Sequence, residues 1–460
     1  MFPESFIKRI RTQEYIDAGE LLESLQQASP SSIRINLSKW NKRPHDSEPV
    51  PWCSSGFYLK SRPSFTLDPL FHSGCYYPQE ASGMFVEQVF RQIVKAEEHI
   101  RVLDLCGAPG GKSTHLSSII GQGGLLVTNE VIGSRASVLA ENIAKWGEGN
   151  AIVTRNDPSA FKELPGFFDV ILTDAPCSGE GMFRDVVAQN EWSEENTTHC
   201  SVRQKRILGD VWPALKENGI LIYSTCTFNP GENEENIKWL VTTRQADSLE
   251  LDITGFSGIT KIDFKGIYGY GFYPDRIKGE GLFISVIRKR GFEVNSMQGK
   301  RKGKIPVPEK SDIEIAGRLT SFHPENIVRL GDEIHCHSGN PDEFNLLSQK
   351  LKIISPGTKI CTVKKNGYVP DHELALSAGI RNDNFHKAEL DYGQAIAYLR
   401  RDNNTFGEIP KGWFIVSYKG ISLGFCNNIG TRVNNYFPVD LRIRMSIPKE
   451  GPKNILLWDD

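Results

Sequence analysis

A glycine-rich turn between an apolar run and a helical run constrains the fold of this chain most strongly. Residues 104–113, DLCGAPGGKS, follow the apolar run IRVLDL and precede the helical run STHLSSII. Glycines let the backbone approach a ligand closely, and the N-terminus of the next helix offers free N–H groups. Strand, glycine turn and helix in this order predict a ligand-binding βα unit of an open α/β sheet.

Further apolar runs alternate with helical stretches from residue 100 to about 290. They are GLLVTNE, AIVTR, FFDVILTD, GILIYSTC and LFISVIRK. This alternation is typical of a mostly parallel sheet with helices on both faces. We therefore expect a Rossmann-like α/β domain here.

Acidic residues follow four of these predicted strands, at Asp104, Glu130, Asp157 and Asp174. In an open α/β sheet, ligands bind beyond the carboxyl ends of the strands, so these acids should converge on one crevice. Glu130 is placed to bind ribose hydroxyls and Asp157 to bind the exocyclic amine of adenine. A single acid beside Gly or Pro is more often a helix cap or turn residue, but four together indicate a site for a nucleoside-bearing cofactor. A phosphate-loop motif is excluded, because Cys106 takes the place of its first glycine.

At 460 residues the chain is too long for one ordinary domain. Pro-rich and aromatic-rich sequence before the glycine turn predicts a small α+β subdomain, and the strand-like runs WFIVSY and ISLGFC near the end predict a β-rich domain. The expected division is an accessory N-terminal subdomain at 1–80, the Rossmann-like domain at 81–290, a basic linker at 291–311, an intermediate domain at 312–385 and a terminal domain at 386–460.

Composition and cysteine spacing indicate the cellular setting. The formal charge of −2 shows no global bias, so any RNA-binding surface must be local. Nine cysteines include no C-x-x-C pair, which argues for reduced thiols in the cytoplasm, and no segment reads as a signal peptide or membrane span. The sequence also contains the triplet His335-Cys336-His337. Adjacent residues of a strand point to opposite faces, so the triplet cannot form a metal site by itself and we expect no bound metal.

Two cysteines follow predicted strands and face the same crevice. Cys177 lies in DAPCSG, directly after Asp174, and Cys226 lies in STCTF. A lone cysteine at a strand end is most often a small buried hydrophobic residue. A pair in this context instead indicates thiol chemistry beside the cofactor.

The combination of DLCGAPGGKS, DAPCSG and STCTFNPGENE resembles the Sun/Nop family of S-adenosylmethionine-dependent RNA (cytosine-5) methyltransferases. The segments SIRIN (32–36) and YPQEAS (77–82) extend the resemblance to about residues 30–290. The tail, with KGWF, GISLG and NNYFP, resembles the PUA-type RNA-binding end of the family's RsmF-type 16S rRNA methyltransferases. The resemblance thus implies a class I methyltransferase with a β-rich PUA-like C-terminal domain.

The resemblance implies that Cys226 is the nucleophile and Cys177 the releasing cysteine. DNA cytosine-5 methyltransferases use the Pro-Cys cysteine instead, which would swap the two roles. Carbon 5 of cytosine is too electron-poor to attack a methyl sulfonium, so a thiolate must first add at carbon 6. Asp174 is the candidate for hydrogen bonding at N3 of the base. N-methylation is disfavoured, since DAPC lacks the Pro-Pro-aromatic motif of amine methyltransferases.

The remaining expectations concern cofactor, partner and substrate. The expected S-adenosylmethionine-binding residues are Cys106, Gly107, Ala108, Pro109, Gly110, Gly111, Lys112, Glu130, Asp157 and Asp174, with Arg135 close by. The expected substrate is 16S rRNA in the small ribosomal subunit, bound by a monomer. A tRNA methyltransferase and a non-catalytic ribosome-assembly factor remain as alternatives. The target cytosine should flip out of its stack and lie against Tyr77, Phe183 or Phe228.

Overall fold

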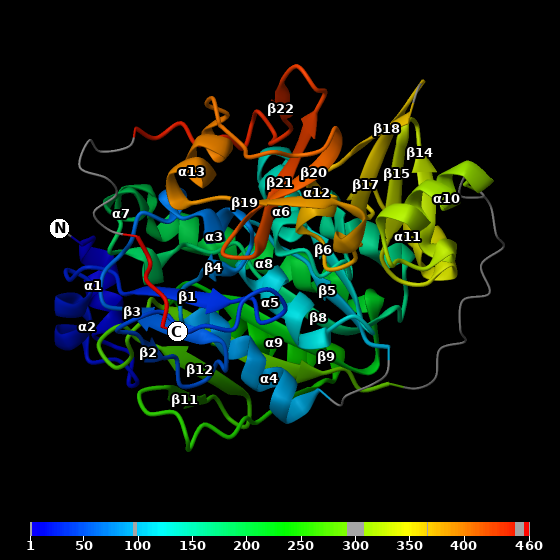
Figure 1. The fold of residues 1–460 in the computed structure, drawn as a ribbon. Helices are drawn as coiled ribbons and strands as arrows, with labels where there is room; N and C mark the ends of the chain where they lie inside the picture. The colour runs from blue at the N-terminus through cyan, green and yellow to red at the C-terminus, as the bar shows by residue number, and fades with distance from the viewer. Residues whose placement is uncertain (1, 95–98, 292–307, 366, 447–454, 460) are drawn as a thin grey trace.

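The computed structural model describes residues 2–94, 99–291, 308–365, 367–446 and 455–459, and the strands in these ranges form four sheets (Figure 1). Most of the predicted basic linker, from residue 292 to 307, lies outside the described residues. None of the helices in the described ranges combines the length and apolar character needed to cross a lipid bilayer.

The largest sheet has ten strands and carries the glycine turn. Its order is β11-β12-β13-β9-β8-β5-β6-β7-β16, with β10 paired to β13. The five central strands β5 to β9 run parallel, as the sequence predicts. Their bounds are β5 Arg101–Asp104, β6 Leu125–Asn129, β7 Ala151–Thr154, β8 Phe168–Asp174 and β9 Leu215–Thr225.

The predicted last strand, LFISVIRK, runs antiparallel to its neighbours, which agrees with a sheet that is mostly, and not wholly, parallel. It forms β13 (Leu282–Arg288), which pairs antiparallel with β9 and β12. No helix lies between β10 and β13 among the described residues, and a parallel pairing of successive strands requires such a crossover, so the pairs β11–β12, β12–β13 and β10–β13 are antiparallel. These strands are β10 Asp247–Leu249, β11 Thr260–Asp263 and β12 Tyr268–Phe272. The α/β fold class itself is confirmed.

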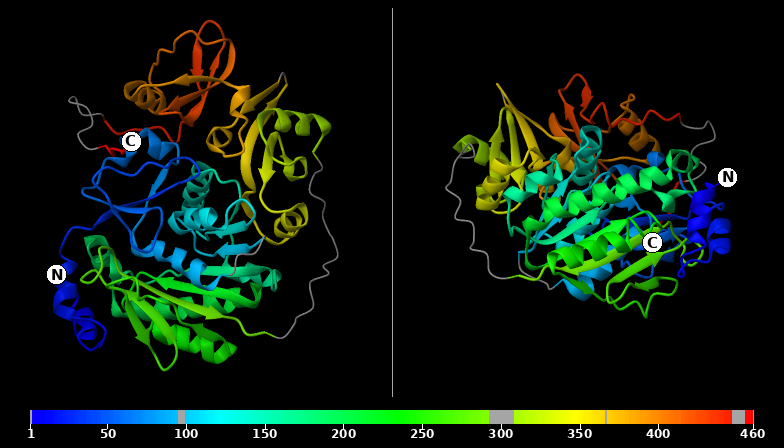
Figure 2. Two further views of the ribbon diagram at one scale, coloured as in Figure 1. Left: turned by 60° about the horizontal axis from the view of Figure 1, so that its bottom comes forward. Right: turned by 180° about the vertical axis from the view of Figure 1, so that it is seen from behind.

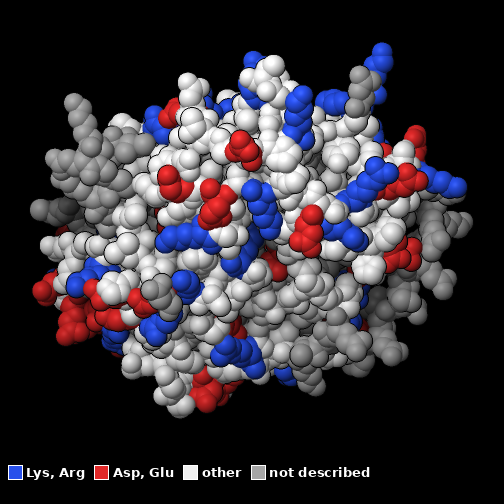
Figure 3. Space-filling view, in the orientation of Figure 1, with Lys and Arg blue, Asp and Glu red and all other residues white. Residues whose placement is uncertain are grey.

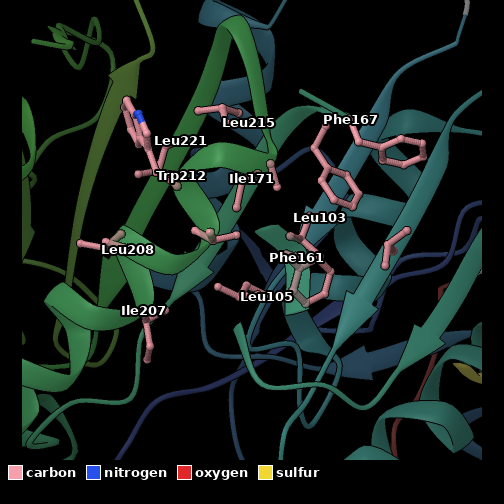
Figure 4. Close-up of a cluster of buried hydrophobic side chains, with 14 of the residues drawn as sticks. Leu103, Leu105, Phe161, Phe167, Ile171, Ile207, Leu208, Trp212, Leu215 and Leu221 are labelled. Carbon is pink, nitrogen blue, oxygen red and sulfur yellow. The ribbon is translucent and has the colours of Figure 1, made fainter. Parts of the chain in front are cut away.

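Alternate residues of the central strands enter two different cores. Leu103, Ile171 and Leu221 belong to the cluster drawn in Figure 4, whereas Val102 and Val170 belong to the cluster on the other face. Because both faces are buried, each of these strands contains a run of consecutive apolar residues. The helices of this domain are α4 Val86–Ile93, α5 Gly111–Ile120, α6 Gly133–Trp146, α7 Val186–Glu191, α8 Glu194–Val211 and α9 Glu234–Arg244, with the 3-10 helices η2 Ser82–Phe85, η3 Pro158–Glu163, η4 Glu180–Met182 and η5 Trp212–Ala214.

The N-terminal region combines short helices with a four-stranded sheet of order β2-β3-β1-β4. Its elements are α1 Glu4–Ile10, α2 Ala18–Ser24, β1 Ser31–Ile35, β2 Glu48–Pro49, β3 Gly56–Leu59, η1 Phe65–Leu67, α3 Pro69–His72 and β4 Tyr76–Pro78. The end of the chain returns to this region, as Figure 2 shows, and the rings of Trp40 and Trp458 lie 5.5 Å apart.

The C-terminal part forms two four-stranded sheets, β14-β15-β17-β18 and β19-β20-β21-β22. The first region also extends the central sheet, because β16 pairs with β7. Its elements are α10 Lys310–Leu319, η6 Pro324–Asn326, β14 Ile327–Leu330, β15 Glu333–His337, α11 Pro341–Lys350, β16 Ile353–Ser355, β17 Gly357–Lys364, β18 Gly367–Pro370, α12 His372–Leu376 and η7 Asn382–Asn384.

The last sheet contains the predicted hairpin. Its elements are β19 His386–Glu389, α13 Tyr392–Arg400, β20 Gly412–Tyr418, β21 Ile421–Asn428 and β22 Val433–Asn435. Lys419 and Gly420 both have positive φ, as a two-residue hairpin turn of this hand requires. On the face shown in Figure 3, acidic and basic side chains are interspersed, which agrees with the weak net charge.

Candidate active site

A pocket of about 470 Å³ lies at the carboxyl ends of the parallel strands. Seven of the predicted site residues line it: Cys106, Ala108, Glu130, Asp157, Asp174, Cys177 and Cys226. The other five predicted residues, Gly107, Pro109, Gly110, Gly111 and Lys112, are not among the described residues that line it. Of these five, Lys112 donates a hydrogen bond to Asp174, which does line it.

The glycine turn is fixed by close packing behind it. A Cβ atom on Gly107 would lie 2.2 Å from Oγ1 of Thr128, so no larger residue fits there. Gly110 has a φ of 119°, which favours glycine. Asp104 is fully buried and accepts a 2.6 Å hydrogen bond from Ser113, and burial raises the pKa of Asp104 to about 7. Asp104 therefore shapes the turn from behind.

Asn129 joins three strand ends, a role that the sequence analysis missed. Its side-chain amide donates to the carbonyls of Leu105 and Asn156, and its Oδ1 accepts from the backbone N–H of Asn156. Asn129 is 1% exposed, so these bonds are shielded from water. A polar residue at the end of an otherwise apolar strand was the only available sign of this role.

The two predicted nucleoside-binding acids both reach the pocket. Glu130 lies just beyond β6, where Oε1 accepts from the N–H of Ile132 and Oε2 lies 3.6 Å from Arg135. Asp157 lies beyond β7. Its Oδ1 caps η3 by accepting hydrogen bonds from the backbone N–H and the hydroxyl group of Ser159, which is the helix-cap role considered above as the alternative for such an acid. Its Oδ2 accepts from Arg206 at 3.2 Å. Asp157 is thus both a cap and a pocket residue.

The pocket suits the cofactor that the sequence implies. A volume of about 470 Å³ is within the usual range for a small-molecule site. Carboxylates beyond β6 and β7 can accept from hydroxyl and amine groups, and the backbone of the glycine turn forms the adjacent wall. The apolar wall includes Ile132, Pro158 and Ile207. These carboxylates and this apolar wall fit a nucleoside that carries a charged amino-acid chain.

The register of two neighbouring strands brings the two cysteines together. Asp174 at the end of β8 pairs with Ser224 at the end of β9, so the residues that follow both strands share one edge. The Sγ atoms of Cys177 and Cys226 lie 2.8 Å apart, and both cysteines are partly exposed. The hydrogen bond to Cys226, together with burial, raises the pKa of Cys177 well above its ordinary value.

Asp174 is held between a cation and a hydroxyl group beside the cysteines. Lys112 donates to Oδ2 at 2.8 Å, and Ser224 donates to Oδ1 at 2.6 Å. Burial alone would lower the pKa of Lys112, but the Asp174 carboxylate outweighs burial and raises it. Lys112 therefore stays charged and binds Asp174, which is a more specific role than capping backbone carbonyls.

The aromatic residues predicted to stack on the target base are buried, so that prediction is wrong for all three. Phe183 is fully buried against Phe6 of α1, while Phe228 is 4% and Tyr77 9% exposed. The missed residue is Met182, which is 48% exposed, lines the pocket and places its sulfur 3.9 Å from that of Cys226.

A second group of polar side chains lies away from this pocket. The ligand-type atoms of Cys53, Glu87 and His115 lie within 4.8 Å of one another. Hydrogen bonds and ion pairs account for this group, because Glu87 pairs with Arg91 and accepts from Ser54 and His115. We assign no metal to it.

Comparison with known sequences identifies the family. The 16S rRNA methyltransferase RsmB/F family matches residues 91–288, the N-terminal domain of RsmF matches residues 2–81, and the RsmF PUA domain matches residues 385–443. Ribosomal RNA small subunit methyltransferase F of Shewanella loihica is 31% identical over 95% of each chain. The protein of that name from Aliivibrio fischeri is 32% identical over 95% of this chain and 97% of its own.

Solved structures agree with this assignment. A methyltransferase homolog protein from Pyrococcus horikoshii is 28% identical, with a TM-score of 0.53 over 63% of this chain and 95% of its own. NSun6 from the same organism shares the fold at 19% identity, with a TM-score of 0.51 over 63% of this chain and 99% of its own. The chain therefore belongs to the RsmF family of S-adenosylmethionine-dependent 16S rRNA methyltransferases.

Proposed function

We propose that this enzyme methylates carbon 5 of a cytosine in 16S rRNA of the small ribosomal subunit, with Cys226 as the covalent nucleophile. The observation that carries the proposal is the 2.8 Å contact between the sulfurs of Cys226 and Cys177 at the wall of the nucleoside-type pocket. A generic methyltransferase needs no thiol there, whereas carbon-5 methylation requires nucleophilic addition at carbon 6.

The reaction follows from the placement of three side chains. The thiolate of Cys226 adds to carbon 6, and the electron pair of the carbon 5–carbon 6 bond becomes available at carbon 5. Asp174 is proposed to donate a hydrogen bond to N3 of the base and so to stabilise the adduct. For this it must carry a proton, because its carboxylate form, which accepts from Lys112, cannot donate. S-adenosylmethionine, when bound, would supply the electrophilic methyl group, with S-adenosylhomocysteine as the leaving group. The carbon 5 proton then leaves to a base, and the bond between Cys226 and carbon 6 breaks.

Cys177 is proposed to assist this release. Its raised pKa keeps its proton on sulfur until a product has formed, and its contact with Cys226 places that proton beside the departing thiolate. The reversed assignment would use Cys177 as nucleophile, and its raised pKa makes this less favourable because the thiolate is the reactive form.

The proposed cofactor residues are the glycine turn from Cys106 to Lys112, Glu130, Asp157 and Asp174. Glu130 would bind the ribose hydroxyls, and Asp157 would accept from the adenine amine. The cofactor sulfonium would then lie between the turn and Cys226, since Ala108 and Cys226 line the same pocket.

We further propose that a monomer acts on the small ribosomal subunit in the cytoplasm, and that the C-terminal PUA domain binds the RNA. The relatives named small subunit methyltransferases align over nearly their full length, which supports this substrate rather than tRNA.

The test uses labelled S-adenosylmethionine with small ribosomal subunits, free 16S rRNA or bulk tRNA, followed by mass spectrometry of the nucleosides. We expect 5-methylcytidine in the subunit or its RNA, and none with Cys226→Ala. Methylation of tRNA alone would overturn the substrate, and product from Cys226→Ala would overturn the nucleophile. A wild-type protein without any product would support a non-catalytic assembly factor.

A further inference from the structure

A fully buried acid lies behind the two cysteine loops and takes no part in the mechanism above. Glu232 is 0% exposed and lies in the loop between β9 and α9. Its Oε2 accepts from the backbone N–H of Ser178 at 3.0 Å and from Gln204 at 2.9 Å. Its Oε1 accepts from the hydroxyl group of Ser178 at 2.5 Å. Both oxygens of Glu232 therefore act on the Cys177 loop or on α8.

The hydroxyl groups next to the two cysteines connect this acid to both of them. Ser178 directly follows Cys177, and Thr227 directly follows Cys226. The Oγ atom of Ser178 lies 2.9 Å from the Oγ1 atom of Thr227. Ser178 is 7% exposed and Thr227 1% exposed, so the contact is shielded from solvent. The resulting chain runs from Glu232 through Ser178 to Thr227.

A buried carboxylate is costly and needs a compensating role or compensating bonds. Burial raises the pKa of Glu232 to about 7, although its hydrogen bonds from Ser178 and Gln204 act to lower it. Glutamine could keep the two bonds to Oε2 through its carbonyl oxygen, but its amide nitrogen cannot accept from the Ser178 hydroxyl group. A carboxylate is therefore needed for the Ser178 hydroxyl group to donate to this residue.

We propose that Glu232 is a positioning residue that holds the Cys177 and Cys226 loops at their close separation, acting through Ser178 and Thr227. The expected effect of Glu232 on catalysis rests on the cysteine roles proposed above. Its expected effect on the structure concerns only the distance between the two sulfurs. Misplacing a reacting group by about 1 Å can lower a rate by about 100-fold.

The test compares Glu232→Gln with Glu234→Gln. Glu234 is a matched control, because it lies two residues away, is 8% exposed and has a pKa raised by burial to about 7. Its side chain has no described hydrogen bond with either cysteine loop, and its Oε2 has no partner among the described residues. Circular dichroism first confirms that each variant is folded.

The primary measurement is disulfide formation between Cys177 and Cys226 in the RNA-free enzyme treated with diamide, a reagent that takes two electrons and two protons from a thiol pair. Mass spectrometry localises the disulfide. We expect Glu232→Gln to form it at least about 10-fold more slowly than wild type, and Glu234→Gln to stay within about twofold. If Glu232 acted only through its charge, Glu232→Gln would instead form the disulfide faster. The Glu232 carboxylate raises the pKa of Cys177, so its removal would increase the thiolate fraction.

Activity provides the second measurement. We expect kcat of Glu232→Gln to fall about 10- to 100-fold, with KM for RNA and for S-adenosylmethionine unchanged within about twofold. Thr227→Val, which keeps Glu232 and its bonds to Ser178, should slow disulfide formation in the same direction. Unchanged disulfide formation in Glu232→Gln, or equal slowing in Glu234→Gln, would overturn the positioning role. Slower disulfide formation in an enzyme whose nucleophile proves not to be Cys226 would overturn the proposed function alone.

Discussion

The sulfur of Cys177 accepts a hydrogen bond from the backbone N–H of Cys226 at 3.2 Å and lies 2.8 Å from the sulfur of Cys226. One cysteine is therefore held to the backbone of the other as well as to its thiol. The Cys177 thiol, with its raised pKa, can donate to Cys226 and stabilise negative charge there. This asymmetry supports the proposed roles, in which Cys226 adds to the base and Cys177 handles the proton.

Removing Cys177 should therefore slow product release rather than addition. We expect Cys177→Ala to lower turnover by about 10²- to 10⁴-fold, the usual contribution of a positioned acid or base. A protein–RNA adduct stable to denaturing electrophoresis should accumulate, because Cys226 can still add to carbon 6. The double variant with Cys226→Ala should form no adduct. An adduct in Cys226→Ala, with none in Cys177→Ala, would reverse the two roles.

The two glycines of the turn give a matched test of cofactor binding. Gly107→Ala would place a Cβ atom 2.2 Å from Thr128, whereas Gly111→Ala would make ordinary contacts, the shortest at 3.4 Å to Tyr77. We expect Gly107→Ala to weaken S-adenosylmethionine binding at least about 100-fold, because the turn must shift, and Gly111→Ala to change it by less than about threefold. Calorimetric titration measures both. Equal affinities for the two variants would show that the turn backbone does not contact the cofactor.

Asp174 and Asp157 should separate catalysis from cofactor affinity. Asp174→Asn loses the ion pair with Lys112 beside the cysteines, and we expect kcat to fall about 10²- to 10⁴-fold. Asp157→Asn keeps an oxygen acceptor for its cap, and we expect a KM increase for S-adenosylmethionine of up to about 10-fold with kcat little changed. Steady-state kinetics at saturating RNA distinguishes them. A pure KM effect in Asp174→Asn would limit that residue to cofactor binding.

Strand ends were predictable from the sequence, but the contacts between distant segments were not. Asp174 and Cys226 follow apolar runs of neighbouring parallel strands, so their meeting follows from the sheet alone. Phe183 was expected to face the substrate, yet α1 covers it with Phe6, and Arg9 of the same helix pairs with Glu180 from 171 residues away. Local patterns in the sequence cannot specify such packing between segments.

Glu232 was missed for a related reason. In the sequence NPGENE it has the features of a turn or helix-cap residue, and nothing nearby indicates burial. Its environment is created when β8, α8 and β9 assemble around it. The position of Cys226 at the end of one strand could thus be predicted from the sequence. The burial of Glu232 could not, because it depends on how three elements assemble.

Glu234→Gln should stabilise the fold at high pH and leave it unchanged at low pH. The pKa of Glu234 rises on folding from 4.5 to about 7, because burial penalises its charged form. Below pH 4.5 both the folded and unfolded states are protonated, so the charge carries no penalty. As pH rises from 4.5 to 7, Glu234 loses its proton in the unfolded state before it does in the folded state, so the wild type becomes less stable. The destabilisation is complete above pH 7.

A shift of this size corresponds to up to about 3 kcal/mol, and burying the neutral amide of the variant costs about as much as burying the protonated carboxyl group of the wild type. We therefore expect the variant to exceed the wild type in free energy of unfolding by about 2–3 kcal/mol at pH 8 and by about 0 at pH 4.5. Urea denaturation at the two pH values measures the difference, and methyl transfer should be unaffected. Equal stability of the two proteins at pH 8 would mean that Glu234 is as well solvated in the folded enzyme as in the unfolded chain.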